Sequence, residues 1–211
     1  MTSEQRFRQL TEHHGISYLF HITHRSNLEP IALSGLKPHN QAHADHDPVD
    51  VSDPNVNQRR SRRDPVHGRS LHDYVPLYFR ARNPMLYRRS NVQKELAILY
   101  VDKFVMLISG TIFTDGNAAS RSTGFFDDLE NLDQLDWECL HAEYWRDFVD
   151  GRRKRCAEVL VPRVLPFALV SKIVVQNQDS LAVARVATRL GDISPTSTTQ
   201  VVLRLILPDI G

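Results

Sequence analysis

The chain has 211 residues, a formal net charge of +1 and 41% hydrophobic residues, the composition of an ordinary soluble globular protein. Its two cysteines are too few for a disulfide framework. It has neither an N-terminal export signal nor a run of about 18 apolar residues that would insert into a membrane. We therefore expect one cytoplasmic domain over residues 1–211, with no membrane partner.

Short helical and extended patterns alternate in the first part of the chain. Residues 3–12 predict a helix, and residues 17–23 predict a strand because they are rich in aromatic and β-branched side chains. A second helix is expected over about 26–34, ended by Gly35. Residues 39–68 show no apolar periodicity, which predicts a long functional or disordered loop.

Extended segments follow this loop. Residues 74–79 predict a strand, and Pro76 places it at a sheet edge or a bulge, because proline donates no backbone hydrogen bond. Asn83-Pro84 is typical of a helix start. Residues 96–101 and 104–108 are apolar and predict further strands or strand-like apolar segments.

The last third mixes helices and strands. Residues 110–124 have loop chemistry, and helical spacing over 125–132 and 137–148 includes an aromatic stripe that we assign to core packing. The remaining expectations are strands at 157–161, 170–176 and 200–206 and a helix near 179–189. The absence of a βαβ rhythm and of a glycine-rich phosphate loop argues against a Rossmann or P-loop enzyme.

Glu158 is the acid with the most informative surroundings. It follows the basic run 152–155 and opens a short apolar strand, where an ionised carboxylate needs a partner. A solvated acid beside a basic cluster explains the local sequence equally well. Further arginines cluster at 59–63 and 80–89, and the planar guanidinium suits phosphates and base edges. The histidine pairs His21/His24 and His43/His46 lack the helical spacing of hydrolytic zinc sites, so we expect no metal.

A succession of short motifs carries more weight than any single residue. In chain order, these motifs are His21-Ile22-Thr23-His24, Asn27-Leu28, Gly35-Leu36, His39-Asn40-Gln41, Gln58-Arg59-Arg60, 71–79 (LHDYVPLYF), 82–87 (RNPMLY), 113–117 (FTDGN), Leu135-Asp136-Trp137 and 153–161 (RKRCAEVLV). Together they resemble the DarT toxin family over nearly the whole chain, from about residue 17 to residue 205. The resemblance implies an α+β fold with an ADP-ribosyltransferase-like split antiparallel β-sheet core and flanking helices.

The same resemblance implies a reaction. DarT toxins consume NAD, transfer its ADP-ribose to a base of single-stranded DNA and release nicotinamide. Each is paired with an antitoxin that removes the ADP-ribose, of the macrodomain DarG type or the NADAR type. Breaking the nicotinamide–ribose bond builds positive charge on the sugar, so a nearby carboxylate would stabilise the transition state.

By this resemblance, the motif positions receive expected roles. Glu158 and Arg59 are the expected catalytic residues, with Arg59 also closing over the cofactor on a loop at about 40–63. The expected NAD-binding residues are His21, Ile22, Thr23, Pro30, Lys37 and Arg59. Residues of about 117–157 would present the DNA strand, with Arg152, Arg153 and Arg155 on its phosphates.

The target is less constrained than the chemistry. Both thymine- and guanine-modifying members exist, and the short segment 88–93, which lacks the glycine-rich insertion of many relatives, favours guanine. Two other readings stay open: an RNA-directed NAD-dependent transferase of the same fold, and a non-catalytic nucleic-acid-binding module. Recognition of RNA would require a contact to the 2′-hydroxyl, which the sequence does not reveal.

Overall fold

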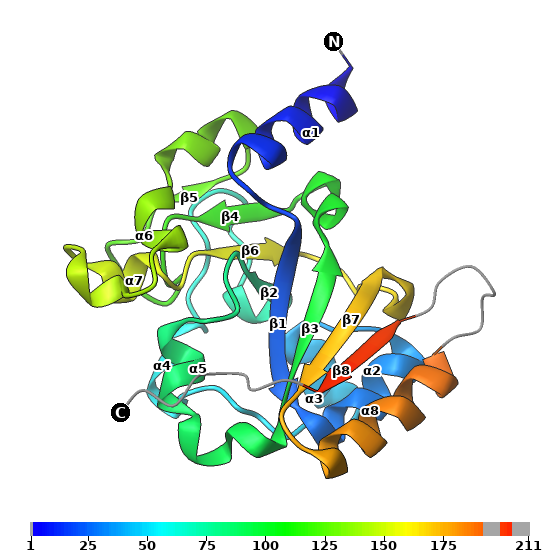
Figure 1. The fold of residues 1–211 in the computed structure, drawn as a ribbon. Helices are drawn as coiled ribbons and strands as arrows, with labels where there is room; N and C mark the ends of the chain where they lie inside the picture. Colours follow the sequence, from blue (N-terminus) through cyan, green and yellow to red (C-terminus); the bar gives the residue numbers. More distant parts are fainter. Residues whose placement is uncertain (1, 192–198, 204–211) are drawn as a thin grey trace.

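The computed structural model describes residues 2–191 and 199–203 (Figure 1). Its strands are β1 (Tyr18–His24), β2 (Val75–Tyr78), β3 (Leu96–Asp102), β4 (Ile112–Thr114), β5 (Phe125–Phe126), β6 (Glu158–Val161), β7 (Val170–Val175) and β8 (Gln200–Leu203). Over this part of the chain they form one sheet in the order β5-β4-β6-β2-β1-β3-β7-β8. Neighbouring strands run antiparallel except β7 and β8, which are parallel.

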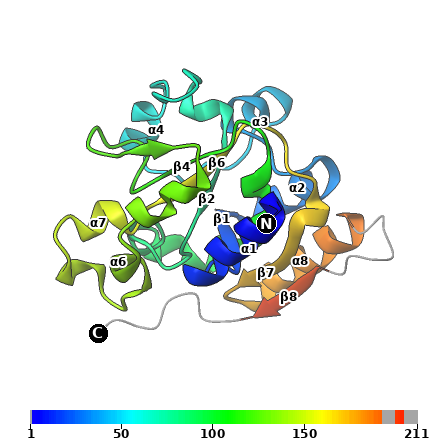
Figure 2. The ribbon, with the colours of Figure 1, turned by 90° about the horizontal axis from the view of Figure 1, so that it is seen from above.

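Helices flank this sheet at both ends. They are α1 (Ser3–His13), α2 (Leu28–Ser34), α3 (His39–Asp45), α4 (Pro54–Arg59), α5 (Pro84–Arg88), α6 (Trp137–His141), α7 (Gly151–Lys154) and α8 (Gln178–Gly191). Seen from above, α6 and α7 lie at one end of the molecule, and α8 lies beside β8 at the other (Figure 2). Within the described residues, no helix is long and apolar enough to span a bilayer.

The sheet is split between β1 and β2. These strands share a single register pair, Phe20 with Tyr78, whereas β1 pairs with β3 from Tyr18 to His24. In Figure 1, β1 and β3 run steeply across the direction of β4 and β6. The predicted α+β fold with a split, largely antiparallel sheet and flanking helices is therefore confirmed.

Pro76 lies at this split, and the prediction of an edge strand or bulge was wrong. β2 is an interior strand, and Pro76 is in register with Leu160 of β6. The Pro76 carbonyl accepts a hydrogen bond from His21 Nδ1 at 3.0 Å, so this carbonyl faces β1. In a strand, the nitrogen of a residue faces the same side as its carbonyl. The position where Pro76 lacks an N–H therefore faces β1, and β1 and β2 form no regular hydrogen-bond ladder there. The proline consequently removes no hydrogen bond from the sheet.

The main hydrophobic core lies on one face of the sheet, and it determines where Glu158 points. Val159 and Val161 belong to this core, whereas Leu160 packs with Leu71 in a smaller cluster. Because strand side chains alternate between faces, Glu158 lies on the same side as Leu160. β6 thus presents its first residue to the face away from the main core.

Most predicted elements of the sheet are confirmed, and the errors concern short helices. Residues 104–107 lie in a 3-10 helix (Lys103–Leu107), because the Asp102 side chain caps the turn by accepting from the Phe104 N–H at 2.8 Å, and Ile108 follows it as the C-cap. The expected helices at 125–132 and 137–148 are reduced to β5, α6 and two 3-10 turns, Leu129–Gln134 and Trp145–Asp147. The loop predicted at 110–124 contains β4. Residues 204–206 of the last predicted strand lie outside the described residues.

The long segment 39–68 is partly helical. It contains α3 and α4, and α4 begins with Asp53 as N-cap and proline at the first helical position. The Asp53 carboxylate accepts from the N–H groups of Asn55 at 2.9 Å and Val56 at 3.3 Å. An aspartate followed by proline is a helix-start signal that could have located α4 in the sequence.

Candidate active site

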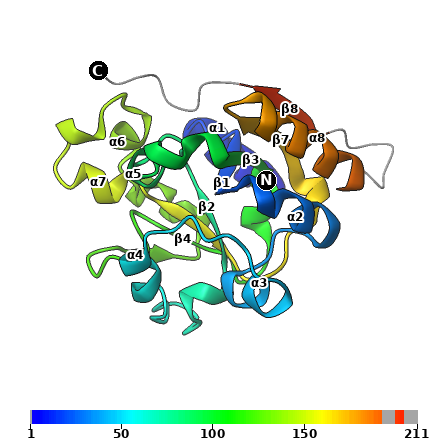
Figure 3. The same ribbon diagram turned by 90° about the horizontal axis from the view of Figure 1, so that it is seen from below.

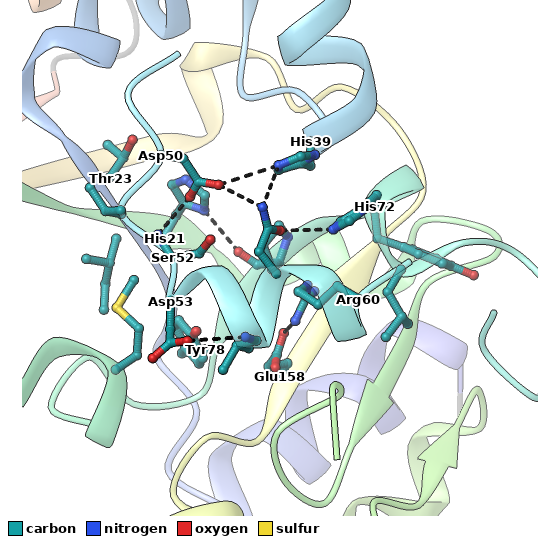
Figure 4. A pocket seen from close by; sticks show the side chains of 18 of the residues that line it. His21, Thr23, His39, Asp50, Ser52, Asp53, Arg60, His72, Tyr78 and Glu158 are labelled. Atoms are coloured by element: carbon teal, nitrogen blue, oxygen red, sulfur yellow. Dashed lines mark hydrogen bonds and ion pairs between the residues drawn. The ribbon is translucent and has the colours of Figure 1, made fainter. Parts of the chain in front are cut away.

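A cavity of about 660 Å³ opens at the split (Figure 4). Its walls come from β1, the segment with α3 and α4, α5 and the start of β6. His21 and Glu158, more than a hundred residues apart in sequence, both line this cavity. Its volume is in the range of small-molecule sites, which is roughly 300–1,000 Å³.

Glu158 is buried and fully hydrogen-bonded. Only 1% of the residue is exposed. Its Oε2 accepts from Arg60 Nη1 at 2.8 Å, and its Oε1 accepts from the backbone N–H of Ala118 at 3.0 Å. A buried carboxylate without partners would be costly, and here each oxygen has a donor. The carboxylate is therefore held in one orientation at the wall of the cavity.

Arg60 has donor capacity left over. Within the described residues, its Nη2 is buried without a hydrogen-bond partner, although Nη1 is engaged by Glu158. Burial lowers the Arg60 pKa, but the charge of Glu158 and the neighbouring Tyr78 oppose this, and the pKa is raised overall. The guanidinium is thus permanently charged, and its Nη2 is a donor that no described protein group satisfies.

Tyr78 lies directly opposite Glu158 in the β2–β6 register. Burial, and next the negative charge of Glu158, raise the pKa of Tyr78 well above its usual value of 10. The phenol is therefore neutral at physiological pH. The wall formed by Arg60, Tyr78 and Glu158 carries one cation, one neutral hydroxyl and one anion.

His21 is a neutral hydrogen-bond acceptor. Because a carbonyl can only accept, the 3.0 Å contact to Pro76 places the proton on Nδ1 and leaves Nε2 as an acceptor. Burial lowers the His21 pKa, and the hydrogen bond to Pro76 only partly opposes this. A neutral imidazole of this kind suits a ligand hydroxyl.

Asn27 connects β1 to the segment that covers the cavity. Its Nδ2 donates to Thr23 Oγ1 at 3.0 Å and to the Val49 carbonyl at 2.9 Å, and its Oδ1 accepts from the Val49 N–H at 3.0 Å. Ile22, Thr23 and Asn27 are buried and line the cavity. The sequence places Asn27 in a family motif, Asn27-Leu28, but assigns it no role, so this contact was missed.

A polar network closes the cavity on the side of α3 and α4. The rings of His39 and His72 stack at 4.3 Å, and Asn57 bonds to both His72 and Asp50 at 2.9 Å. Beside His39, the pKa of Asp50 falls well below its usual value. His39, His43 and Asp50 place polar atoms within 4.8 Å of one another, close enough for a metal ion, but Asn57 already engages Asp50. The network therefore connects His39, Asp50 and Asn57 of segment 39–68, in which the sequence shows no apolar periodicity, to His72 beyond it.

The other expected cofactor residues differ in position. Lys37 lines the cavity and forms an ion pair with Asp45 at 2.7 Å. Pro30 lies on α2, outside the part of the lining contributed by the described residues. Arg59 is exposed at the cavity rim, and its neighbour Arg60 makes the contact with Glu158. The sequence motif contains both arginines, and the expectation named Arg59 as the catalytic one, whereas in the structure Arg60 contacts Glu158.

The three arginines expected on DNA phosphates also separate. Arg152 is exposed at the rim, and Arg153 pairs with Asp115 at 2.7 Å and with Asp150. Arg155 is only 4% exposed, and burial lowers its pKa to about 10. Its guanidinium donates to the carbonyls of Arg82, Cys139, Leu140 and Ala142. These contacts correct the expectation for Arg155, because its donors are occupied inside the protein.

Comparison with known proteins places this geometry in a family. A curated DNA ADP-ribosyl transferase from Thermus sp. strain 2.9 is 35% identical over 170 residues, covering 76% of this chain and 81% of the relative. A transferase–glycohydrolase fusion protein from Thermosipho africanus is 32% identical over 169 residues, covering 76% of this chain and 43% of the fusion.

Solved structures agree with these sequence relatives. Thermus sp. 2.9 DarT in complex with ADP-ribosylated ssDNA superposes with a TM-score of 0.77 at 31% identity, covering 90% of this chain and 95% of that chain. The same protein with NAD+ gives a TM-score of 0.72 at 29% identity, covering 88% and 95%. The family model described as "ssDNA thymidine ADP-ribosyltransferase, DarT" matches residues 20–198. The chain therefore belongs to the DarT family of DNA ADP-ribosyltransferases.

Proposed function

We propose that this protein transfers ADP-ribose from NAD to a base of single-stranded DNA, releases nicotinamide and thereby acts as a toxin. The observation that carries the proposal is the Glu158 carboxylate, buried and fixed by two donors in the same cavity as the neutral His21. The relative from Thermus sp. 2.9 has been solved with NAD+ and with ADP-ribosylated ssDNA.

In this mechanism, Glu158 acts on the ribose next to nicotinamide. The bond between the ribose carbon and the pyridinium nitrogen breaks, and its electron pair leaves with neutral nicotinamide. Positive charge then develops on the sugar, a base nitrogen or oxygen donates an electron pair to the same carbon, and the proton of the base passes to solvent. A carboxylate held by Arg60 and Ala118 needs no reorganisation during this step, so it stabilises the transition state more than bound NAD.

His21 and its neighbours would bind the remainder of NAD. The Nε2 acceptor of His21 suits a hydroxyl of the adenosine-side ribose, and Ile22 and Thr23 would contact the nicotinamide amide. Lys37 would border the cofactor, and segment 40–63 would close over it. Asn27 supports this arrangement because it joins Thr23 to Val49 at the edge of that segment.

The two neighbouring arginines have different proposed roles. Arg60 holds Glu158, lines the cavity and has an Nη2 without a partner among the described residues, so it would stabilise negative charge on a deprotonated base. Arg59, exposed at the rim, would close over bound NAD. A guanidinium hardly ever loses its proton, so both act as cations and neither as a general base.

The DNA-facing residues are Arg152 and the wall formed by about 117–157. Asn117, Ser120, Arg152 and Arg153 contribute to the cavity lining from this range. The target base must be unstacked to reach the sugar, which favours single strands. The family description names thymidine, whereas the short 88–93 segment favours guanine, so the target base must be measured directly.

The proposed partner in the cell is an ADP-ribosylglycohydrolase antitoxin of the DarG macrodomain type. The relative from Thermosipho africanus is itself a fusion of a transferase and a glycohydrolase. We place the reaction in the cytoplasm, because NAD and transiently single-stranded DNA occur together there in bacteria.

The test uses labelled NAD with single-stranded DNA, duplex DNA and RNA oligonucleotides that each contain one reactive base type. We expect label on single-stranded DNA of one base type, and none with Glu158→Ala at unchanged fold. Label on RNA alone would instead support the RNA-directed enzyme. Label on protein only, or on nothing, would refute the proposed function, and label on nothing is the result expected of the non-catalytic binding module.

A further inference from the structure

A cluster of two exposed tyrosines, the exposed Arg146 and the half-buried Arg82 lies outside the catalytic wall. Tyr144 is 51% exposed and Tyr87 is 38% exposed. The Arg82 guanidinium lies 5.9 Å from the Tyr144 ring centroid, and that of Arg146 lies 5.5 Å from the Tyr87 centroid. We call these four residues the tyrosine–arginine surface. The sequence assigned Tyr144 to core packing, and its exposure contradicts that assignment.

Buried residues hold this surface in place. Trp145 packs edge-on against Tyr87 with centroids 6.2 Å apart, and the Arg155 guanidinium lies 5.9 Å from the Trp145 ring. The same guanidinium donates to the Arg82 carbonyl at 2.8 Å and to the Ala142 carbonyl at 2.8 Å. The buried Arg155 therefore connects the segment that carries Arg82 to the segment that carries Tyr144 and Arg146.

The turn after Trp145 is equally constrained. Asp150 adopts the left-handed region with φ 57°, and a Cβ on Gly151 would lie 1.8 Å from the Trp145 carbonyl oxygen. Only glycine allows this close approach, so the sequence fixes the path of the chain between Trp145 and α7. A rigid arrangement of exposed rings loses little freedom when it binds a ligand.

The tyrosine–arginine surface adjoins the catalytic cavity. Its Tyr87 belongs to α5, whose Met85 and Arg88 line the cavity, and it continues into the turn whose Asp150 and Arg152 also line it. In the view from below, α5 overlaps α6 and α7 (Figure 3), and the Tyr87 ring of α5 lies 6.2 Å from the ring of Trp145, in the turn between α6 and α7. A polymer with one unit in the cavity would pass over these rings as it leaves.

We infer that the tyrosine–arginine surface binds the nucleotides that flank the target base, by stacking their bases on Tyr87 and Tyr144. This inference rests on the proposed function, because it extends the single-stranded DNA substrate beyond the reacting base. Aromatic rings accept the face of any base, and arginines over such rings add cation–π attraction and phosphate contacts. Exposed, unpaired bases are found in single strands and not in duplexes.

Stacking contributes more than net charge at this surface. Arg82 and Arg146 have no carboxylate partner among the described residues, but the same segment carries the exposed acids Glu143 and Asp147. These acids offset the two positive charges. We therefore expect loss of a ring to weaken binding more than loss of an arginine.

The experiment compares a long oligonucleotide, with the target base at its centre, with an otherwise identical strand in which every nucleotide other than the target is abasic. Fluorescence anisotropy without NAD gives affinity, and labelled NAD gives kcat and KM. Removing one stacking ring should cost roughly 5- to 100-fold in affinity, so Tyr144→Ala should weaken long-strand binding by this factor. KM for the long strand should rise similarly, kcat should be unchanged, and Tyr144→Phe should behave as wild type.

The matched controls are Tyr18→Ala, at a tyrosine 41% exposed on β1, and Arg185→Ala, at an exposed arginine of α8. Long-strand affinity equal in Tyr144→Ala and Tyr18→Ala would overturn the inference. An equal loss with the abasic strand would also overturn it, since the effect would then not depend on the flanking bases. Failure of wild-type protein to label any DNA would refute the proposed function instead, and anisotropy would still test the surface separately.

Discussion

The contact between Arg60 and Glu158 makes a quantitative prediction for Glu158→Gln. The glutamine oxygen can keep the Ala118 N–H, but its NH2 group then faces the Arg60 donor, and the buried cation loses its counter-charge. Breaking a buried ion pair on one side costs about 3–5 kcal/mol. For a protein of this size, that loss lowers Tm by about 6–20 °C. Transfer should fall by roughly 10²- to 10³-fold in kcat, the effect of removing one transition-state contact.

The double variant Glu158→Gln/Arg60→Met separates stability from catalysis. Methionine removes the unpaired cation and fills similar space, so the remaining cost is one unsatisfied amide, about 1–3 kcal/mol. We expect the double variant to be more stable than Glu158→Gln and equally inactive. Thermal unfolding followed by circular dichroism gives stability, and single-turnover transfer from labelled NAD gives activity.

Two results would refute this reasoning. A double variant no more stable than Glu158→Gln would mean that Arg60 is not the charge partner of Glu158. Transfer by Glu158→Gln within tenfold of wild type would mean that the carboxylate does not stabilise the reacting sugar. The exposed neighbour provides the control, because Arg59→Met should leave Tm unchanged.

Three further predictions concern the cofactor wall and the arginines. Because His21 has a pKa below its ordinary 6.5, the neutral acceptor and its stabilising effect are fully present above pH 6.5 and are lost as pH falls through the lowered pKa. KM for NAD should therefore rise only below pH 6.5, and His21→Gln should abolish this rise; a rise of equal size in the variant would contradict it. Asn27→Ala should raise KM for NAD with little change in kcat, because it frees Val49 from β1; an unchanged KM would remove Asn27 from the site. Arg155→Lys should lower Tm because one ammonium cannot serve four carbonyls, whereas Arg152→Ala should keep Tm and weaken DNA binding at low salt. If Arg155→Lys instead kept Tm and weakened DNA binding, Arg155 would be a phosphate ligand after all.

Local patterns in the sequence were enough to locate the strands that carry the site. The β-branched and aromatic residues of β1 and the apolar run after Glu158 predict both strands, and the acid at the start of β6 is visible directly. The ordered motifs added the family and the split sheet. These features depend on neighbouring residues or on a long succession of motifs, so one chain can reveal them.

Contacts between distant segments could not be read in this way. Whether Arg59 or Arg60 reaches Glu158 depends on where α4 ends, and 39–68 lacks the apolar periodicity that would define a helix. Arg155 is buried because four carbonyls converge on it, and no local pattern encodes that convergence. The basic run 152–155 therefore looks uniform in sequence although its members have different surroundings.

The position of Pro76 has a consequence for the shape of the molecule. If β1 and β2 continued to pair beyond the Phe20–Tyr78 register pair, they would gain further backbone hydrogen bonds. Pro76 lacks the N–H donor that this pairing would require on β2, and its carbonyl already accepts a hydrogen bond from the His21 imidazole. Pro76 thus prevents further pairing of β1 with β2 and keeps the two halves of the sheet separate. A valine at this position would supply the missing N–H, and we would expect the strands to close and the space between them to shrink.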